Sequence, residues 1–239
     1  MTHDASPARG VRLGRAAGAD GLGSTVSGAV LVFPSRSGPV LLSPGPVRRV
    51  IRELARAGGP DGLAVHLVQE ADGDPGAAAE EAVRRYGDVP VCLAGYGTGG
   101  LAALRGAGHA AVNSVVALAP CLPDGEAPSG SPEPVNQLAG RQVLIVHGTN
   151  DGRAHPESSF RLAARAKKTN RSTCRFEVHS DGHRLREHRA EVAALTVDFV
   201  LGAVLGGRWS RPVTDALAAP PPLGLRMPLA AGFGRSLRG

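Results

Sequence analysis

A chain of 239 residues is long enough for one α/β domain with a substantial core, and 42% hydrophobic but only 3% aromatic residues predict a core of Ala, Val and Leu. The net charge of +6 comes from scattered arginines rather than from basic runs interleaved with aromatic residues, which argues against nucleic-acid binding. No stretch approaches the roughly 18 uninterrupted apolar residues of a membrane span and no signal-peptide pattern opens the chain, so we expect a cytoplasmic protein without a membrane partner.

The three cysteines, Cys92, Cys121 and Cys174, form no C-x-x-C pair that would indicate zinc or redox chemistry. Their number is odd, and two of them lie in apolar, strand-like runs. We therefore expect buried thiols in a reducing cell rather than a set of disulfides.

The first 24 residues are polar and rich in Gly and Ala, which predicts a flexible lead-in before a folded domain at 25–208. Within that domain, apolar runs alternate with segments whose apolar residues recur at helical spacing. The expected strands are 29–33, 63–68, 90–94, 114–119, 142–146 and 174–179. The expected helices are 47–57, 77–86, 98–106, 157–168 and 185–205.

Strands that alternate with helices at this spacing predict an α/β fold, in which a mostly parallel sheet is covered by helices on both faces. The proline-rich residues 120–137 separate two strands and are too few to form a cap domain. Residues 209–239 are rich in Pro, Ala and Gly, so we expect a mobile tail there rather than a second domain.

The segment 90–101 combines a short strand, a glycine-rich turn and the start of a helix. Gly95, Gly97 and Gly100 match the dinucleotide fingerprint G-x-G-x-x-G, whereas Gly95 and Gly99 match only the frame of the nucleophile elbow G-x-S-x-G. At least two strands precede this turn, and no acid ends the next strand to hold a ribose hydroxyl. Dinucleotide binding is therefore the less favoured alternative, and we expect no cofactor.

Two polar residues follow later strands of the predicted sheet. Asp151 comes shortly after strand 142–146, and His183 comes after strand 174–179. The order of elbow, acid and histidine along the chain is that of the α/β-hydrolase fold. Because the carboxyl ends of parallel strands meet at one edge of the sheet, we expect both side chains at the same rim.

With these features the chain resembles small, lidless α/β-hydrolases of the sort common in actinobacteria, over about residues 29–205. The resemblance rests on the segments 95–100, 115–120, 147–151 and 181–183. It implies the α/β-hydrolase fold without a cap domain and an acid–histidine pair formed by Asp151 and His183. It also implies a vacant nucleophile position, because Gly97 stands where the family has serine.

The resemblance further implies oxyanion-hole N–H groups. Thr98 would provide one, and the loop after the first strong strand would provide the other, with Ser35 as the candidate. Cys121, which follows a strand end at the same rim, and again Ser35 are the candidates for a substitute nucleophile.

Three functional interpretations remain open. The first is a pseudo-hydrolase that has lost catalysis or binds a small ligand. The second is a non-nucleophilic enzyme of hydrolase or lyase type, in which His183, oriented by Asp151, acts as general base. The third uses a substitute nucleophile. His179, His183 and His188 with Asp181 match no metal motif, so we expect no metal site, and the sequence gives no oligomeric state.

Overall fold

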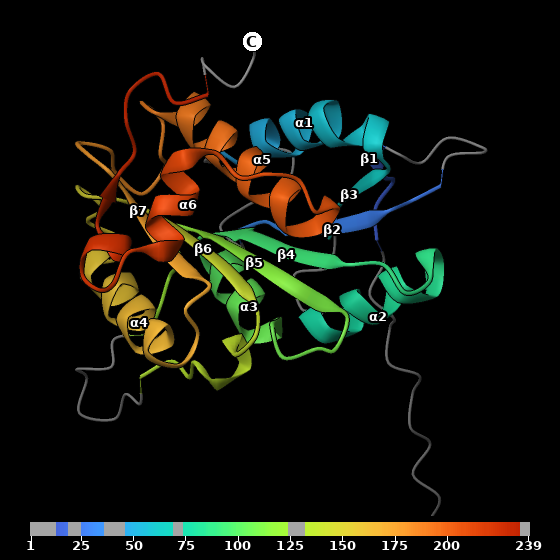
Figure 1. The fold of residues 1–239 in the computed structure, drawn as a ribbon, viewed down its shortest axis with the longest axis horizontal. Coiled ribbons are helices and arrows are strands. Elements are labelled where there is room, and N and C mark those ends of the chain that lie inside the picture. Colours follow the sequence, from blue (N-terminus) through green and yellow to red (C-terminus); the bar gives the residue numbers. More distant parts are fainter. Residues whose placement is uncertain (1–12, 19–24, 36–45, 69–73, 124–131, 235–239) are drawn as a thin grey trace, which may run out of the picture.

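The computed structural model describes residues 13–18, 25–35, 46–68, 74–123 and 132–234. Its centre is an eight-stranded sheet in the order β1-β3-β2-β4-β5-β6-β7-β8 (Figure 1). Neighbouring strands are parallel except for β1, which pairs antiparallel with β3. The strands are β1 Ala17–Gly18, β2 Gly28–Phe33, β3 Leu63–Leu67, β4 Val91–Tyr96, β5 Val112–Leu118, β6 Gln142–Gly148, β7 Thr173–Val178 and β8 Met227–Pro228.

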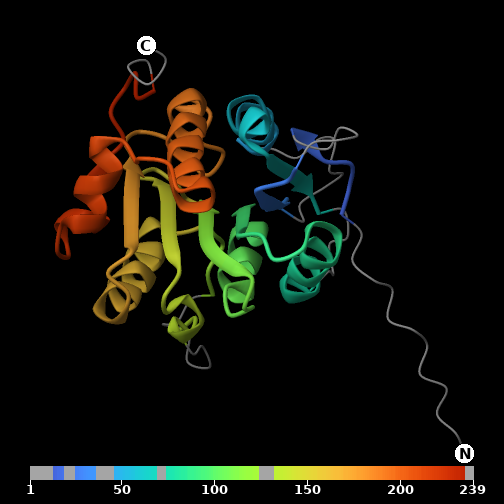
Figure 2. The same ribbon diagram turned by 45° about the vertical axis from the view of Figure 1, so that its right-hand side comes forward.

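Helices cover both faces of this sheet (Figures 1 and 2). One face carries α1 Val47–Gly58 and α5 Arg189–Leu205, with α6 Arg211–Ala218 beside β7. The other carries α2 Pro75–Tyr86, α3 Thr98–Gly106 and α4 Pro156–Thr169. This arrangement confirms the predicted α/β fold with a mostly parallel sheet between two helical layers.

Strand β2 is apolar throughout because both of its faces are covered. In β2, Val30 and Val32 belong to the apolar cluster shared with α1 and α5, whereas Ala29 and Leu31 belong to the cluster shared with α2 and α3. Successive side chains of a strand point to opposite faces, so a strand between two helical layers buries apolar residues on both of its faces.

Part of the predicted lead-in is ordered against the sheet edge. Leu13 forms an antiparallel bridge with Val68, and Ala17–Gly18 pairs with β3 as the edge strand β1. The interpretation of the whole segment as a loose lead-in was therefore wrong for residues 13–18. Residues 1–12 and 19–24 lie outside the described residues.

Residues 209–234 form ordered structure, which corrects the expectation of a mobile tail. Trp209 Nε1 donates a hydrogen bond to Phe199 O at 3.0 Å, and the two rings stack with centroids 6.1 Å apart. Val213 and Ala216 of α6 are fully buried, and β8 pairs with β7. The Pro/Gly-rich composition was misleading because Pro and Gly lie both in the turns and within these short elements, whose few apolar side chains pack on the domain. Residues 235–239 lie outside the described part.

The last long helix, α5, begins at Arg189 rather than at residue 185. The buried carboxylate of Asp181 accepts hydrogen bonds at 3.0–3.1 Å from the backbone N–H groups of Arg186, Glu187 and His188. These bonds hold the preceding residues in a separate turn, so the helix starts only after it.

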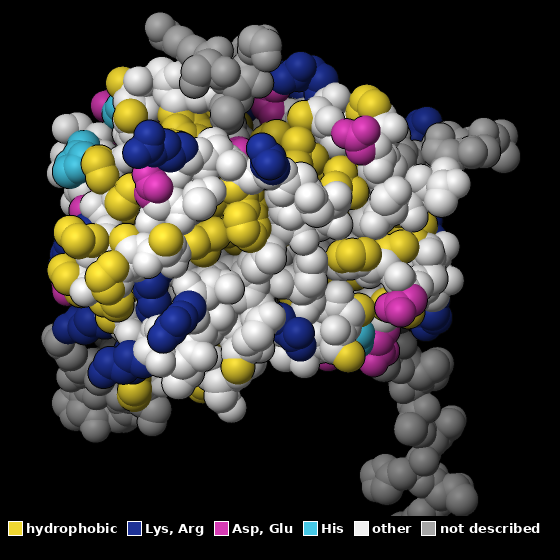
Figure 3. Space-filling model, in the orientation of Figure 1, with side chains coloured by type: hydrophobic (Ala, Val, Ile, Leu, Met, Phe, Trp, Pro, Cys, Tyr) yellow, Lys and Arg dark blue, Asp and Glu magenta, His cyan; other side chains and the backbone are white. Residues whose placement is uncertain are grey.

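Between β5 and β6, the described residues include only one short 3₁₀ helix, Asn136–Leu138, and no cap domain. Residues 124–131 of this predicted loop lie outside the described part. Among the helices of the described residues, none is long and apolar enough to cross a membrane. On the face shown in Figure 3, Lys and Arg side chains are interspersed with acidic and apolar ones.

Candidate functional site

The turn between β4 and α3 has the geometry of an elbow. Gly97 has φ 58° and ψ −119°, a backbone conformation that side-chain-bearing residues adopt only with strain. Two neighbouring glycines are required by close packing: a Cβ on Gly95 would lie 2.1 Å from Gly99 O, and a Cβ on Gly99 would lie 2.1 Å from Phe33 O. The close packing of β4, α3 and the end of β2 therefore requires glycine at positions 95 and 99.

A side chain at position 97 would point at a histidine. An ideal Cβ on Gly97 would lie 3.5 Å from His183 Nε2 and 2.9 Å from Ser35 Oγ. Position 97 therefore has the direction and the histidine neighbour of a nucleophile, but glycine supplies no hydroxyl.

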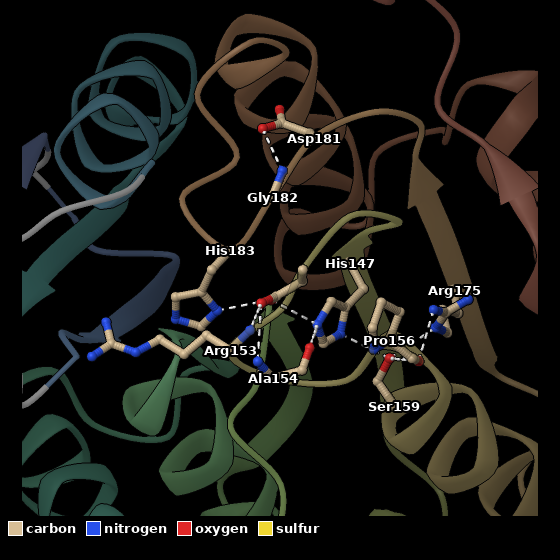
Figure 4. A network of polar contacts seen from close by, with 10 residues as sticks. His147, Arg153, Ala154, Pro156, Ser159, Arg175, Asp181, Gly182 and His183 are labelled. Atoms are coloured by element: carbon tan, nitrogen blue, oxygen red, sulfur yellow. Dashed lines mark hydrogen bonds and ion pairs between the residues drawn. The ribbon is translucent and has the colours of Figure 1, made fainter.

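The structure brings Asp151, which follows β6, next to His183, which follows β7. Asp151 Oδ2 lies 2.8 Å from His183 Nδ1, and Asp151 Oδ1 accepts N–H bonds from Arg153 and Ala154 at 2.8 and 2.9 Å (Figure 4). Burial works to raise the pKa of Asp151, but the hydrogen bonds from His147, His183 and the two backbone N–H groups outweigh it and hold this pKa well below its ordinary value. The carboxylate is therefore ionised and fixed in one orientation.

His147 is a further member of this network whose role the sequence did not reveal. Its Nε2 lies 3.1 Å from Asp151 Oδ2 and 2.9 Å from Ala154 O, so Nε2 carries the hydrogen and donates it. On the other side, His147 Nδ1 lies 2.9 Å from Ser159 Oγ, and this hydroxyl oxygen accepts a bond from Arg175 Nε at 3.0 Å (Figure 4). The only signal in the sequence was a histidine at the end of a strand, four residues before the acid.

His183 faces the elbow with its second ring nitrogen. The hydrogen bond to Asp151 and the neighbouring thiol of Cys121 raise the pKa of His183 to about 9, against the opposing effect of burial. The Tyr96 ring packs against the His183 ring with centroids 5.2 Å apart. At neutral pH the ring is therefore a cation, held between a carboxylate and the empty position at Gly97.

The candidates for the oxyanion hole lie close together at the elbow. Ser35 is buried, and its Oγ lies 3.5 Å from Thr98 Oγ1. The N–H of Gly97 donates to Leu118 O at 2.9 Å, so this donor is used within the fold. The side chain of Thr98 thus points toward Ser35 in the loop after β2, and the use of their backbone N–H groups as an oxyanion hole remains a prediction.

Both substitute nucleophiles suggested by the sequence lie beside the elbow. The N–H of Cys121 donates to Gly97 O at 3.0 Å, and its thiol contributes to the raised pKa of His183. Ser35 Oγ lies 2.9 Å from an ideal Cβ on Gly97. Ser35 Oγ has Thr98 as its hydrogen-bond partner among the described residues.

The histidines of this region do not form a metal centre. In the described part of the chain no three His, Cys, Asp or Glu side chains are grouped so that they could hold a metal ion. Asp181, the acid of that cluster, instead accepts the backbone N–H bonds that precede α5.

Comparisons with known proteins give one family match and a set of similar folds. The sequence profile of the Prolyl oligopeptidase family matches residues 128–205, a segment that contains Asp151 and His183 but not the elbow. Comparison with curated proteins finds no matching relative.

Solved structures show the same fold. Est1E from Butyrivibrio proteoclasticus, with ferulic acid bound, has a TM-score of 0.57 and 15% identity, over 77% of this chain and 92% of that one. The Pyrococcus furiosus esterase Pf2001 has a TM-score of 0.58 and 14% identity, over 76% and 84%. ATU1826 from Agrobacterium tumefaciens, a putative α/β hydrolase, has a TM-score of 0.59 and 14% identity, over 80% and 91%. The protein therefore has the α/β-hydrolase fold, with an acid–histidine pair and a glycine at its elbow.

Proposed function

We propose that this protein has no serine-esterase activity and binds a small molecule in the space between Gly97 and His183. The observation that carries the proposal is the elbow itself. Gly97 has the backbone direction that would aim a side chain at His183 Nε2, yet it provides no oxygen to attack a substrate. With respect to serine chemistry, the protein is a pseudo-hydrolase.

The charges around the site indicate the class of ligand. With a pKa of about 9, His183 is cationic at neutral pH. Arg153 and Arg184, both exposed, lie close enough to Tyr96 to lower its pKa, although burial raises that pKa to about 12 overall. A cationic ring with two arginines at its rim favours a small carboxylate or a polarised carbonyl oxygen. We place this function in the cytoplasm, where free thiols persist.

A second candidate function is catalysis without a covalent intermediate, and the hydrogen-bonded Asp151–His183 pair favours it. A positioned general base contributes on the order of 10²–10⁴ in rate. Because only neutral imidazole accepts a proton, a reaction that uses His183 in this way would accelerate as the pH rises toward about 9.

The test combines a covalent probe with a binding measurement on the full chain. We expect no labelling of the wild-type protein by a serine-directed fluorophosphonate. We also expect the His183 ring signals in an NMR spectrum to shift on addition of acetate or butyrate, and this response to vanish in His183→Gln. His179→Gln is the matched control, because His179 is an exposed histidine four residues earlier. Stoichiometric labelling of a serine would overturn the proposal, and so would a spectrum unchanged by the carboxylates.

A further inference from the structure

Cys121 is the one thiol of this chain that lies at the candidate site. It follows β5, its N–H donates to Gly97 O at 3.0 Å, and it is partly exposed. Cys92 and Cys174, in contrast, are completely buried in the sheet, and burial raises the pKa of both thiols to about 12. The chain therefore offers one accessible thiol and two internal controls.

The partners of this thiol are those of a cysteine nucleophile. Cys121 contributes to the raised pKa of the same ring whose Nδ1 is bonded to Asp151, and an ideal Cβ on Gly97 would lie 3.5 Å from that ring's Nε2. A thiolate stabilised by an adjacent imidazolium is a stronger nucleophile at neutral pH than a free thiol. The backbone bond to Gly97 fixes Cys121 at the edge of the position that a serine would occupy.

A second observation also points to this place. The hydroxyl of Tyr96 is buried and has no hydrogen-bond partner among the described residues, and Tyr96 is 1% exposed. The Tyr96 ring packs against the His183 ring with centroids 5.2 Å apart, and the pKa of Tyr96 is raised to about 12, first by burial, so the hydroxyl remains a neutral donor. An unsatisfied buried donor is costly unless something accepts from it. A charged sulfur or an acyl oxygen bound to it would satisfy this O–H.

We propose that Cys121, His183 and Asp151 form a catalytic triad whose nucleophile has moved from the elbow to the loop after β5, and that this triad transfers acyl groups from small activated esters or thioesters. The proposal rests on the small-molecule site proposed above and names its chemistry.

The reaction balances with water as the only co-reactant. The Cys121 thiolate forms a bond to the acyl carbon, the bond between that carbon and the leaving group breaks, and the leaving group takes the proton from His183. Water then attacks the thioester carbon while His183 removes a proton from it. The carbon–sulfur bond breaks, the acid is released, and the thiolate–imidazolium pair is restored.

The first test is alkylation with iodoacetamide, followed by peptide mass spectrometry. A free thiol of pKa about 8.5 is roughly 0.3% ionised at pH 6. We expect Cys121 to react at least about tenfold faster at pH 6 than N-acetylcysteine, because the His183 ring beside it activates its sulfur. Cys92 and Cys174 should remain unlabelled until the protein is denatured.

Variants then show whether the reactivity of Cys121 comes from the triad or only from the exposure of its thiol. His183→Gln should reduce the reaction of Cys121 to the rate of N-acetylcysteine, whereas His179→Gln should leave it unchanged. Tyr96→Phe, which keeps the ring and removes the hydroxyl, should slow it severalfold. Reaction of wild-type Cys121 no faster than the reference, or equally fast in His183→Gln, would overturn the proposal. The wild-type rate alone decides the question if the His183 variant does not fold.

The second test uses p-nitrophenyl acetate. We expect a transient acetyl group on Cys121, detected by intact-mass and peptide mass spectrometry, and no acetylation or turnover in Cys121→Ala. An unacetylated Cys121 would refute the triad and leave the proposed binding site standing if the His183 signals still respond to carboxylates. Turnover that persists in Cys121→Ala together with fluorophosphonate labelling would instead refute the proposed absence of serine chemistry.

Discussion

His183 Nδ1 lies 2.8 Å from Asp151 Oδ2, although the two residues are 32 positions apart in the chain. The bond joins the loop after β7 to the loop after β6, and it fixes which ring nitrogen faces the elbow. The same carboxylate also accepts from His147 and from two backbone N–H groups, so the orientation of His183 depends on a rigid anion.

The Asp151–His183 pair makes the free energy of unfolding depend on pH in both the acidic and the alkaline range. The pKa of His183 is raised from 6.5 to about 9, so its contribution is complete below about pH 6.5 and is lost as the pH rises through about 9. The pKa of Asp151 is lowered, so its contribution is present above its ordinary value of 3.8 and is lost as the pH falls. We expect the contribution of the pair to be largest between these limits. Urea unfolding of wild type and Asp151→Asn across pH 3–10 measures it, and a difference between the two proteins that does not vary with pH would contradict it.

The same variant should change the titration of the ring. In Asp151→Asn the His183 pKa should fall by at least about one unit, because the largest cause of its elevation is removed. NMR titration of the histidine signals measures this, with the exposed His179 as an internal reference. A His183 pKa that stays near 9 in the variant would show that another group holds the proton.

Replacement of Gly97 tests how much of a serine-hydrolase site is in place. In a Cys121→Ala background, Gly97→Ser should turn over p-nitrophenyl acetate, because the new hydroxyl would extend toward His183 Nε2 from a Cβ 3.5 Å away. The rate should rise with pH toward about 9, as His183 becomes neutral. The substitution should also cost about 1–3 kcal/mol of stability for the positive φ.

Gly97→Ala is the matched control for this experiment. It carries the same backbone strain and the same contact of its Cβ with Ser35 Oγ, at 2.9 Å, but no hydroxyl. We expect it to melt like Gly97→Ser and to have no esterase activity. A folded Gly97→Ser protein as inactive as Gly97→Ala would mean that the oxyanion donors are not placed for ester hydrolysis.

NAD and NADP should not bind. Gly95 and Gly99 are needed for close packing within the domain, and a Cβ on Gly100 would lie 3.3 Å from the Cα of Pro120, so these glycines are accounted for without a pyrophosphate. Isothermal titration calorimetry at millimolar cofactor is the measurement. A saturable heat with either nucleotide would restore the dinucleotide interpretation of the G-x-G-x-x-G pattern.

The C-terminal segment should contribute to the stability of the whole domain. Trp209 is half-buried against Phe199, and Gly202 leaves room for its indole, since a Cβ there would lie 2.2 Å from Trp209 Nε1. Trp209→Ala should lower the free energy of unfolding by about 2–3 kcal/mol. This is at or below the lower end of the usual cost of truncating a large aromatic side chain to alanine, because the Trp209 ring is only half-buried. Arg211→Ala, with a side chain 91% exposed, is the control and should change stability by less than about 0.5 kcal/mol in urea unfolding. Equal stability of the two variants would mean that the segment is not docked.

The sequence by itself determined the fold and the edge of the sheet, at the carboxyl ends of its strands, where the candidate site lies. Unbroken apolar runs such as residues 142–146 indicate strands covered on both faces, and this signal is local. The positions of Asp151 and His183 followed from the same runs, because polar residues after parallel strands share one edge of the sheet.

Only the tertiary structure decided what depends on contacts between distant loops. The bond from Cys121 N–H to Gly97 O and the approach of Ser35 Oγ to the elbow arise where the ends of separate strands meet, and no local sequence pattern predicts these contacts. The C-terminal segment is likewise held by the pairing of β8 with β7. The spacing of apolar residues along a segment predicts which of its faces are buried. These contacts depend instead on how segments far apart in the chain pack together.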